Sequence, residues 1–249
     1  MSPGGSPGVT TAAVALGLTW PSPVIVAECD PSGGALLVGL LGGHVPASQG
    51  LMQYAIEAGR RPHAAAEILA TQLVSLDDGG TVLALPGLTD PRQASGIATA
   101  WPAVATALAA QPADVIADCG RLDSGAAQPL AVLSGARTVA IVLRPTLRQV
   151  WAAHSRVEML AQLGGRDRLV LLLTGPGTHS VREVAHALDI PVAAVLPDDS
   201  RTAALLSDGL GRRRSLTNGS LLRAAKTAGL KLRGHVAAMT QPAEVGAAR

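Results

Sequence analysis

The sequence predicts a single α/β domain with a doubly wound, mostly parallel sheet and helices on both of its faces. Short apolar runs alternate along the chain with stretches of helical spacing, as repeated strand–helix units require. The chain has 249 residues, enough for one large domain of this kind. Hydrophobic residues make up 48% of it but aromatic residues only 2%, so the core must consist mainly of Ala, Val, Leu and Ile, which suit strands buried on both faces.

Six apolar runs are expected to be strands, because each is rich in Val, Ile or Leu and is closed by Pro, Gly or Asp. They cover residues 24–27, 81–85, 114–117, 138–143, 169–173 and 192–196. Helical spacing predicts helices at residues 10–20, 63–73, 92–110, 146–163, 180–188 and 219–232. We expect residues 1–238 to form the single domain and residues 239–249 to be a frayed tail.

The composition argues against several classes of protein. A formal net charge of +2 requires neither nucleic acid nor an acidic partner, and no nucleic acid is expected. The two cysteines, Cys29 and Cys119, give no disulfide framework, and we expect them to be buried in a reducing compartment. No apolar run approaches the ~18 residues of a transmembrane helix, and the first residues do not resemble a signal peptide. The expected location is the cytoplasm.

A glycine-rich segment at residues 4–11 reads GGSPGVTT and precedes an expected helix. In the phosphate-binding pattern GxxxxGK[ST], backbone N–H groups surround the phosphates, a Lys reaches them and a hydroxyl binds Mg²⁺. Gly8 and Thr10 stand at the Gly and Ser/Thr positions of this pattern, but Val9 stands where the Lys belongs. The candidate nucleotide-binding residues are Gly5, Ser6, Gly8, Val9, Thr10 and Thr11.

The position of this segment at the start of the chain is unusual, because a phosphate loop normally follows a strand that fixes its direction. Too few residues precede Gly4 to form such a strand. Either the sheet lacks its first, central strand, or the natural start codon lies upstream. We favour the upstream start codon.

Two acidic residues follow expected strands and are candidates for a Mg²⁺ site. Residues 24–34 read VIVAECDPSGG and contain Asp30, and residues 114–120 read DVIADCG and contain Asp118. Ligands of doubly wound sheets bind at the carboxyl ends of strands, which gives both acids weight. Asp30 has an equally good reading as a turn cap before a proline, and Asp118 as the mark of a strand end. The candidate metal ligands are Thr10, Asp30 and Asp118, and the two acids are also the candidates for a catalytic role.

Together these segments resemble the ParA/MinD family of P-loop NTPases. The run VIVAECDPSGG resembles the family's second strand and switch I, D-x-D-P-x-G-N, with Glu28 in place of the first Asp and Gly34 in place of the Asn. The run DVIADCG resembles the Walker B strand, with Asp118 at the acid associated with Mg²⁺. Residues 191–209 resemble a stretch that lies near the adenine in that family.

The resemblance implies a site for ATP or ADP with Mg²⁺, but in a degenerate form that binds weakly. The family's loop carries two lysines, and the matching positions here are Gly4 and Val9. Hydrolysis is therefore expected to be lost or very weak, because the main electrostatic catalyst is missing. Arg121, just after the Walker B strand, is the nearest candidate for a substitute cation by motif position. Thr174 stands where the family often reads adenine with an Asn.

The resemblance also implies a function. The leading hypothesis is a partner-binding protein, either gated by a nucleotide or independent of it, that positions or assembles a bacterial cellular machine such as a pilus or Tad-type secretion system. Its expected partners are proteins, including the ATPase machinery of such a system and a second copy of the chain. One alternative is a slow, dimer-dependent ATPase of the partitioning type, and another is a plain scaffold with a dead site.

Two basic segments near the end of the chain are expected to have structural roles. The last expected helix carries its leucines and alanines on one face, at residues 221–232, with two glycines bounding it. We expect this face to pack on the domain, and contact with a membrane is not expected, because the apolar surface is small. The run of arginines at residues 212–214 is expected to be a solvated loop.

Overall fold

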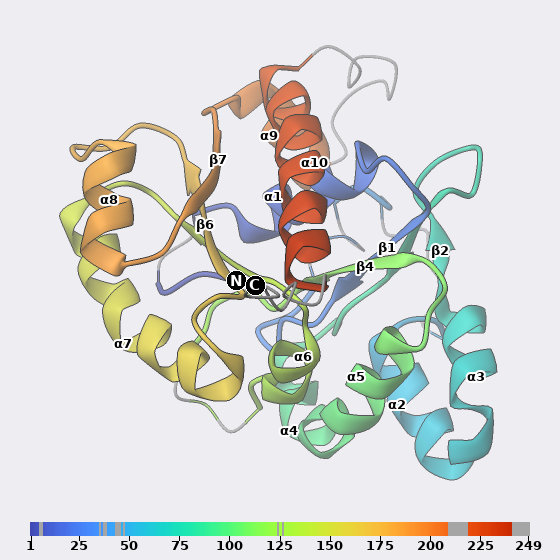
Figure 1. Cartoon of the computed structure of the whole chain (residues 1–249). Coiled ribbons are helices and arrows are strands. Elements are labelled where there is room, and N and C mark those ends of the chain that lie inside the picture. The colour runs from blue at the N-terminus through green and yellow to red at the C-terminus, as the bar shows by residue number, and fades with distance from the viewer. Residues whose placement is uncertain are drawn as a thin grey trace, which may run out of the picture.

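The sheet of the computed structural model lies between two layers of helices (Figure 1). The structure describes residues 1–4, 7–34, 36, 39–42, 46, 48–123, 125, 127–208 and 219–240. The strands of these residues correspond to the six expected apolar runs, with one short strand added. They are β1 (Val24–Glu28), β2 (Val74–Ser75), β3 (Val82–Leu85), β4 (Asp114–Asp118), β5 (Val139–Leu143), β6 (Leu169–Thr174) and β7 (Val192–Leu196).

The strands form two neighbouring groups, with the orders β2-β3-β1-β4 and β5-β6-β7. All pairs are parallel except β2 with β3, so the sheet is mostly parallel as predicted. The unpredicted strand β2 is only two residues long and pairs antiparallel at one edge. No periodic signal of either kind can be read from two residues.

Helices cover both faces of the sheet, and the strand side chains alternate between two apolar cores. One core contains Ala27 and Ile141 together with residues of α2, α5 and α7, while the other contains Val26 and Val142 with residues of α1 and α10. This alternation confirms the doubly wound class. The α-helices are α1 (Val9–Leu18), α2 (Leu51–Arg60), α3 (Ala65–Gln72), α4 (Ala94–Ile97), α5 (Trp101–Ala109), α6 (Leu130–Gly135), α7 (Leu147–Gly164), α8 (Val181–Leu188), α9 (Ser200–Asp208) and α10 (Ser220–Thr240).

The helix expected at residues 92–110 is instead broken into short pieces. A 3₁₀ turn at Pro91–Gln93 precedes α4, and another at Ala98–Ala100 precedes α5. Pro102 stands in the first turn of α5 and has no N–H to continue the helical bonding of the preceding turn, whereas Pro91 only begins the first piece. The helices α2, α6 and α9 were not predicted at all.

The central helix α1 lies very close to the sheet. Its residues from Ala12 to Gly17 are buried between β1, β4 and α10. A Cβ atom on Gly17 would lie 2.3 Å from Cγ2 of Val26, so only glycine permits this approach. The close packing fixes where the first turn of α1 lies relative to the ends of the strands.

The last helix, α10, packs on the domain as predicted. Leu221, Leu222, Ala225 and Ala228 are buried, and Figure 1 shows the helix lying beside α1 and β7. It ends at Thr240, two residues into the expected tail, and residues 241–249 lie outside the described part of the chain. The arginine run at residues 212–214 also lies outside it. Among the described residues, no helix is both long and apolar enough to cross a membrane.

The two strand groups meet at β4 and β5, and only the first residues of the described chain bridge them. Met1 lies beside the middle of β5 and Ser2 beside the residues that follow β4, and the two form backbone hydrogen bonds to both sides. The bonds run from Met1 N to Ala140 O, from Val142 N to Met1 O, from Ser2 N to Gly120 O and from Leu122 N to Ser2 O, at 3.2, 2.8, 2.8 and 2.9 Å.

Further from the carboxyl ends, β4 and β5 have no strand between them among the described residues. Val115, Ile116 and Ala117 of β4 are therefore half-buried, whereas every residue of the neighbouring strand β1 is buried. The facing edges of β4 and β5 are unpaired among the described residues, and Met1 and Ser2 bond to both sides. One further parallel strand that ran into Met1 would continue these bonds.

This geometry predicts the effect of an added segment. An extension of about five β-branched residues before Met1 should pair with β4 and β5, since each added backbone hydrogen bond contributes about 1 kcal/mol. The melting temperature should rise by at least about 3 °C, measured by circular dichroism. An extension of equal length made of Gly and Ser is the control and should leave it unchanged. Equal melting temperatures for the two extended proteins would contradict the prediction.

Candidate functional site

The first turn of α1 begins at the edge of the sheet where the strands end. Gly8 precedes it in the left-handed region, with φ of 85° and ψ of 42°, which glycine adopts without strain. No side chain caps this helix end. The N–H groups of Val9 and Thr10 are therefore not satisfied by a side-chain cap, and the positive end of the helix dipole points outward. Such an end can bind an anion.

Glu28, at the end of β1, joins the segments that follow β1 and β3. Its side chain is buried, and its two carboxylate oxygens accept hydrogen bonds from Leu36 N at 2.8 Å and Gly87 N at 2.9 Å. A Cβ atom on Gly34 would lie 2.6 Å from Oε2 of Glu28. Glu28 and Gly34 both depart from the switch I pattern, and the two departures are linked. The side chain of Glu28 occupies the space that a side chain at position 34 would need.

One carboxylate oxygen of Asp118, at the end of β4, is buried without a hydrogen-bond partner among the described residues. The residue is 1% exposed, and its Oδ1 accepts a hydrogen bond from Gly120 N at 2.9 Å. Its Oδ2 is buried and receives no hydrogen bond from the described residues. A buried carboxylate oxygen without a partner is costly, so a water or a cation fits this position.

Asp30 lies directly beside this acid. A Cβ atom on Gly120 would lie 1.9 Å from Oδ2 of Asp30, so the carboxylate packs against the loop that follows Asp118. Oδ1 of Asp30 accepts a hydrogen bond from Ser32 N at 2.8 Å, which is the turn cap that was the second reading of this residue. Burial, followed by the charge of Asp118, raises the pKa of Asp30 above its usual value. A cation between the two acids would relieve both effects.

Two thiols and the N-terminal amine are buried next to these acids. Burial raises the pKa of Cys119 to about 12 and that of Cys29 well above its usual value, so both thiols stay protonated. Burial also lowers the pKa of the Met1 amine, although the nearby charges of Asp118 and Asp30 favour its charged form. The prediction that both cysteines are buried is confirmed.

A cavity of about 130 Å³ opens on the other side of the first turn of α1, at the ends of β5, β6 and β7. Five separate segments of the chain line it, so its shape depends on how α1, the ends of β5 to β7 and α10 pack together. Oγ1 of Thr174 is buried and has no hydrogen-bond partner among the described residues. The lining residues are Pro7, Gly8, Thr11, Ala12, Arg144, Thr174, Gly175, Leu196, Pro197, Asp198, Asp199, Ala203 and Leu221.

Asp199 joins the two helices at the far wall of this cavity. Its Oδ1 accepts a hydrogen bond from Thr202 N at 3.0 Å in the first turn of α9. Its Oδ2 accepts from Ser220 Oγ at 2.9 Å and Leu221 N at 3.3 Å, where α10 begins. These bonds, led by that from Thr202, lower the pKa of Asp199 to about 2.

The structure brings some of the predicted residues together. Asp30 and Asp118 are neighbours, and Gly8 and Thr11 line the cavity. Val9 and Thr10 lie in the same helical turn without lining it. Gly5 and Ser6 lie outside the described residues.

Sequence reasoning missed Arg144 as part of the site. The residue follows directly on an expected strand, at the carboxyl end where ligands of such sheets bind. That rule could have found it. The same rule was applied only to acidic residues, whereas the search for a cation followed motif positions and led to Arg121. Arg121 is exposed and is not among the residues that line the cavity.

Solved structures with a similar fold span almost the whole chain. MinD of Pyrococcus horikoshii, complexed with Mg-ADP, is 18% identical, with a TM-score of 0.71 and 92% of each chain covered. In the MinC:MinD complex of Aquifex aeolicus the match is 15% identical, with a TM-score of 0.68, over 94% of this chain and 93% of that one. A ParA family ATPase of Chlorobium tepidum is 15% identical, with a TM-score of 0.67, over 92% and 93%.

The chain has the fold of the MinD and ParA ATPases. The predicted fold class and the predicted resemblance are thereby confirmed. No model of a protein family and no curated protein sequence matches the chain. Within the MinD/ParA fold, the acids at the ends of β1 and β4 and the cavity at the ends of β5 to β7 lie on either side of the first turn of α1.

The bonds to Asp199 predict a pH-dependent contribution to stability. Asp199→Ala should lower the free energy of unfolding by about 2 kcal/mol at pH 7, because two helices lose a cap. Since the folded pKa lies below the unfolded value, the contribution is present above pH 3.8 and is lost as the pH falls toward 2. Thermal melts should therefore show a constant difference from pH 5 to 8 that shrinks in acid.

The adjacent Asp198→Ala is the matched control. Asp198 is exposed and accepts no hydrogen bond from the described residues, so its loss should leave the melting temperature nearly unchanged. The difference in melting temperature between Asp199→Ala and the unsubstituted protein should shrink in acid. If it stays the same from pH 7 down to pH 2, the stabilisation does not depend on the charge of Asp199.

Proposed function

We propose that this chain binds a nucleoside di- or triphosphate with Mg²⁺, hydrolyses it very slowly or not at all, and uses the bound state to control its contacts with protein partners. The observation that carries the proposal is the unpartnered, buried Oδ2 of Asp118. It lies beside Asp30 at the same sheet edge as the uncapped first turn of α1. A dead scaffold would not need this arrangement.

The residues fit a Mg²⁺-nucleotide. Carboxylate oxygens and water are the ligands that Mg²⁺ prefers, and Asp118 and Asp30 offer carboxylates next to one another. The N–H groups at the start of α1 suit phosphate oxygens. Thr10, in the same turn, has the hydroxyl that the loop pattern assigns to the ion. When bound, the ion would neutralise charge on the phosphates.

Slow turnover follows from the composition of the loop. Val9 can neither bind the terminal phosphate nor stabilise the charge that develops on it. Removal of such an electrostatic group from phosphoryl-transfer sites costs orders of magnitude in rate. Binding suffers less, because backbone N–H groups remain.

Proteins with this fold support both halves of the proposal. Examples include a MinD complexed with Mg-ADP and a plasmid partition protein of Borrelia burgdorferi bound to AMPPNP, as well as MinD in complex with MinC. By analogy, this chain would switch between shapes that recognise a partner or a second copy of itself. We extend the proposal to a cytoplasmic role in placing or assembling a cellular machine, such as a pilus or Tad-type secretion system, with its ATPase as a partner.

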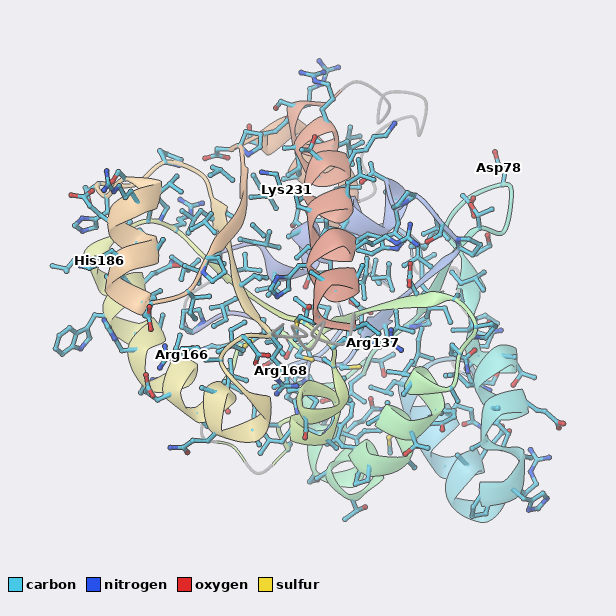
Figure 2. The ribbon with its side chains drawn as sticks, viewed as in Figure 1. Asp78, Arg137, Arg166, Arg168, His186 and Lys231 are labelled. Carbon is cyan, nitrogen blue, oxygen red and sulfur yellow. The ribbon has the colours of Figure 1, made fainter. Side chains whose placement is uncertain are left out.

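Calorimetry with ATP and ADP, each with and without Mg²⁺, tests the site. The protein should bind both nucleotides more tightly with Mg²⁺. Asp118→Asn should lose this Mg²⁺ effect, because the neutral amide is a poor ligand for the ion. Asp78→Asn is the control, since Asp78, labelled in Figure 2, is an exposed acid on the turn between β2 and β3, before the amino end of β3 rather than at the carboxyl ends where the site lies.

No binding at millimolar nucleotide would overturn the proposal. A phosphate-release assay tests the second part of the proposal, that hydrolysis is very slow or absent. Turnover close to one per second, within the usual range of enzymes, would contradict the proposal that hydrolysis is very slow or absent. Sedimentation of the protein with and without Mg²⁺-ATP should show a change in self-association if a second copy is one of the gated partners.

A further inference from the structure

We propose that Arg144 supplies the positive charge for the phosphate chain that a lysine supplies in the usual phosphate loop. This inference rests on the proposed nucleotide site and names the residue that completes it. The loop position itself carries Val9, and residues 1–225 contain no lysine. A side-chain cation for the phosphates is therefore sought among the arginines of other segments.

The position of Arg144 suits this role. It follows β5, the strand that lies next to Met1 and Ser2 in the middle of the carboxyl edge. It lines the same cavity as Gly8 and Thr11 of the first turn of α1. A Cβ atom on Gly175 would lie 3.9 Å from Cζ of Arg144, which places the guanidinium over the end of β6 at the wall of the cavity.

The backbone of Arg144 is held on both sides while its side chain is free to bind a ligand. Its N–H donates to Oε1 of Gln149 at 2.7 Å, and its carbonyl oxygen accepts from Thr146 N at 2.7 Å. The side chain is exposed and forms no ion pair with the described residues. A fixed base with an uncommitted, planar guanidinium is well suited to phosphate oxygens.

The other arginines near the sheet are placed differently. Arg137, Arg166 and Arg168, labelled in Figure 2, precede β5 and β6 and so belong to the opposite edge of the sheet. Arg168 is buried and its Nη1 donates to the carbonyl oxygens of Leu133, Ser134 and Ala136, so its side chain is directed away from the cavity. Among the residues that line the cavity, Arg144 is the single cation.

The charges along the carboxyl edge assign a direction to the nucleotide. Asp118 ends β4 and Asp30 follows β1, on one side of the first turn of α1, and Arg144 lies at the cavity on the other side. Asp198 lies close to Arg144, because its Oδ2 and Cζ of Arg144 would be 3.8 and 3.9 Å from the same Cβ atom on Gly175. Phosphates are attracted by Arg144 and the helix end, whereas the ribose hydroxyls and the N–H groups of a base suit Asp198, whose carboxylate oxygens can accept hydrogen bonds. The phosphates therefore lie between Arg144 and the Mg²⁺ acids.

Calorimetric titration of the full chain with Mg²⁺-ATP and with Mg²⁺-tripolyphosphate tests the inference. Arg144→Ala should weaken both ligands at least about tenfold, the usual scale for loss of a charge-assisted contact. Arg144→Lys should recover part of the affinity, because it restores the charge without the fork. Arg148→Ala is the matched control. This arginine lies in the first turn of α7, shortly after Arg144, is exposed and does not line the cavity.

The melting temperatures of all four proteins are measured alongside, and equal values show that the substitutions leave the fold intact. If Arg144→Ala alters the fold, Arg144→Lys and Arg144→Gln provide the comparison of charged and neutral side chains. Unchanged affinity in the neutral variant would overturn the role of Arg144 and leave the nucleotide site standing. Failure of the unsubstituted protein to bind either ligand at millimolar concentration would overturn both proposals. An equal loss in Arg148→Ala would show a general charge effect and overturn the specific one.

Discussion

Backbone hydrogen bonds from Met1 and Ser2 join the two strand groups, and the candidate site depends on that connection. Asp30 and Asp118 belong to one group, whereas Arg144 and the cavity residues belong mainly to the other. Only near the carboxyl ends do the described residues tie β4 to β5. The packing of α1 across both groups supplies the second constraint, because its close approach to β1 fixes the turn that lies between the acids and the cavity.

The candidate site has groups that suit a cation and groups that suit an anion at different places along the carboxyl edge of the sheet. Buried carboxylates at one end favour a cation, and the uncapped helix end favours an anion. Asp199 lies in the cavity wall, but its oxygens are used in capping α9 and α10. A loop without lysine can therefore keep a polar, oriented site. On the proposed function, the missing lysine would affect catalysis more than recognition, because stabilisation of the transition state needs a charge at one position.

Strands were predictable because their signal is local. Each long strand is an apolar run closed by a breaker, and both cores accept such residues, so pattern and tertiary structure agree. The helices α2 and α6 lack that agreement: α6 is only six residues long, and α2 follows a segment rich in glycine. Asp118 was predictable from its place after a strand, but its unpartnered oxygen was not, because it results from contacts with distant segments. The place of Arg144 at a strand end could be read from the sequence, but its approach to the end of β6 results from the pairing of β5 with β6 and could not.

The two buried thiols give the molecule a built-in reporter. Cys29 and Cys119 immediately follow β1 and β4, next to the acids, and neither contacts solvent appreciably. Thiol reagents attack the thiolate, and burial keeps both groups protonated at neutral pH. Modification of either cysteine therefore requires local opening of the segments that follow β1 and β4, and the rate of modification measures how often they open. A ligand that tightens this edge would slow the labelling even though it touches neither sulfur atom.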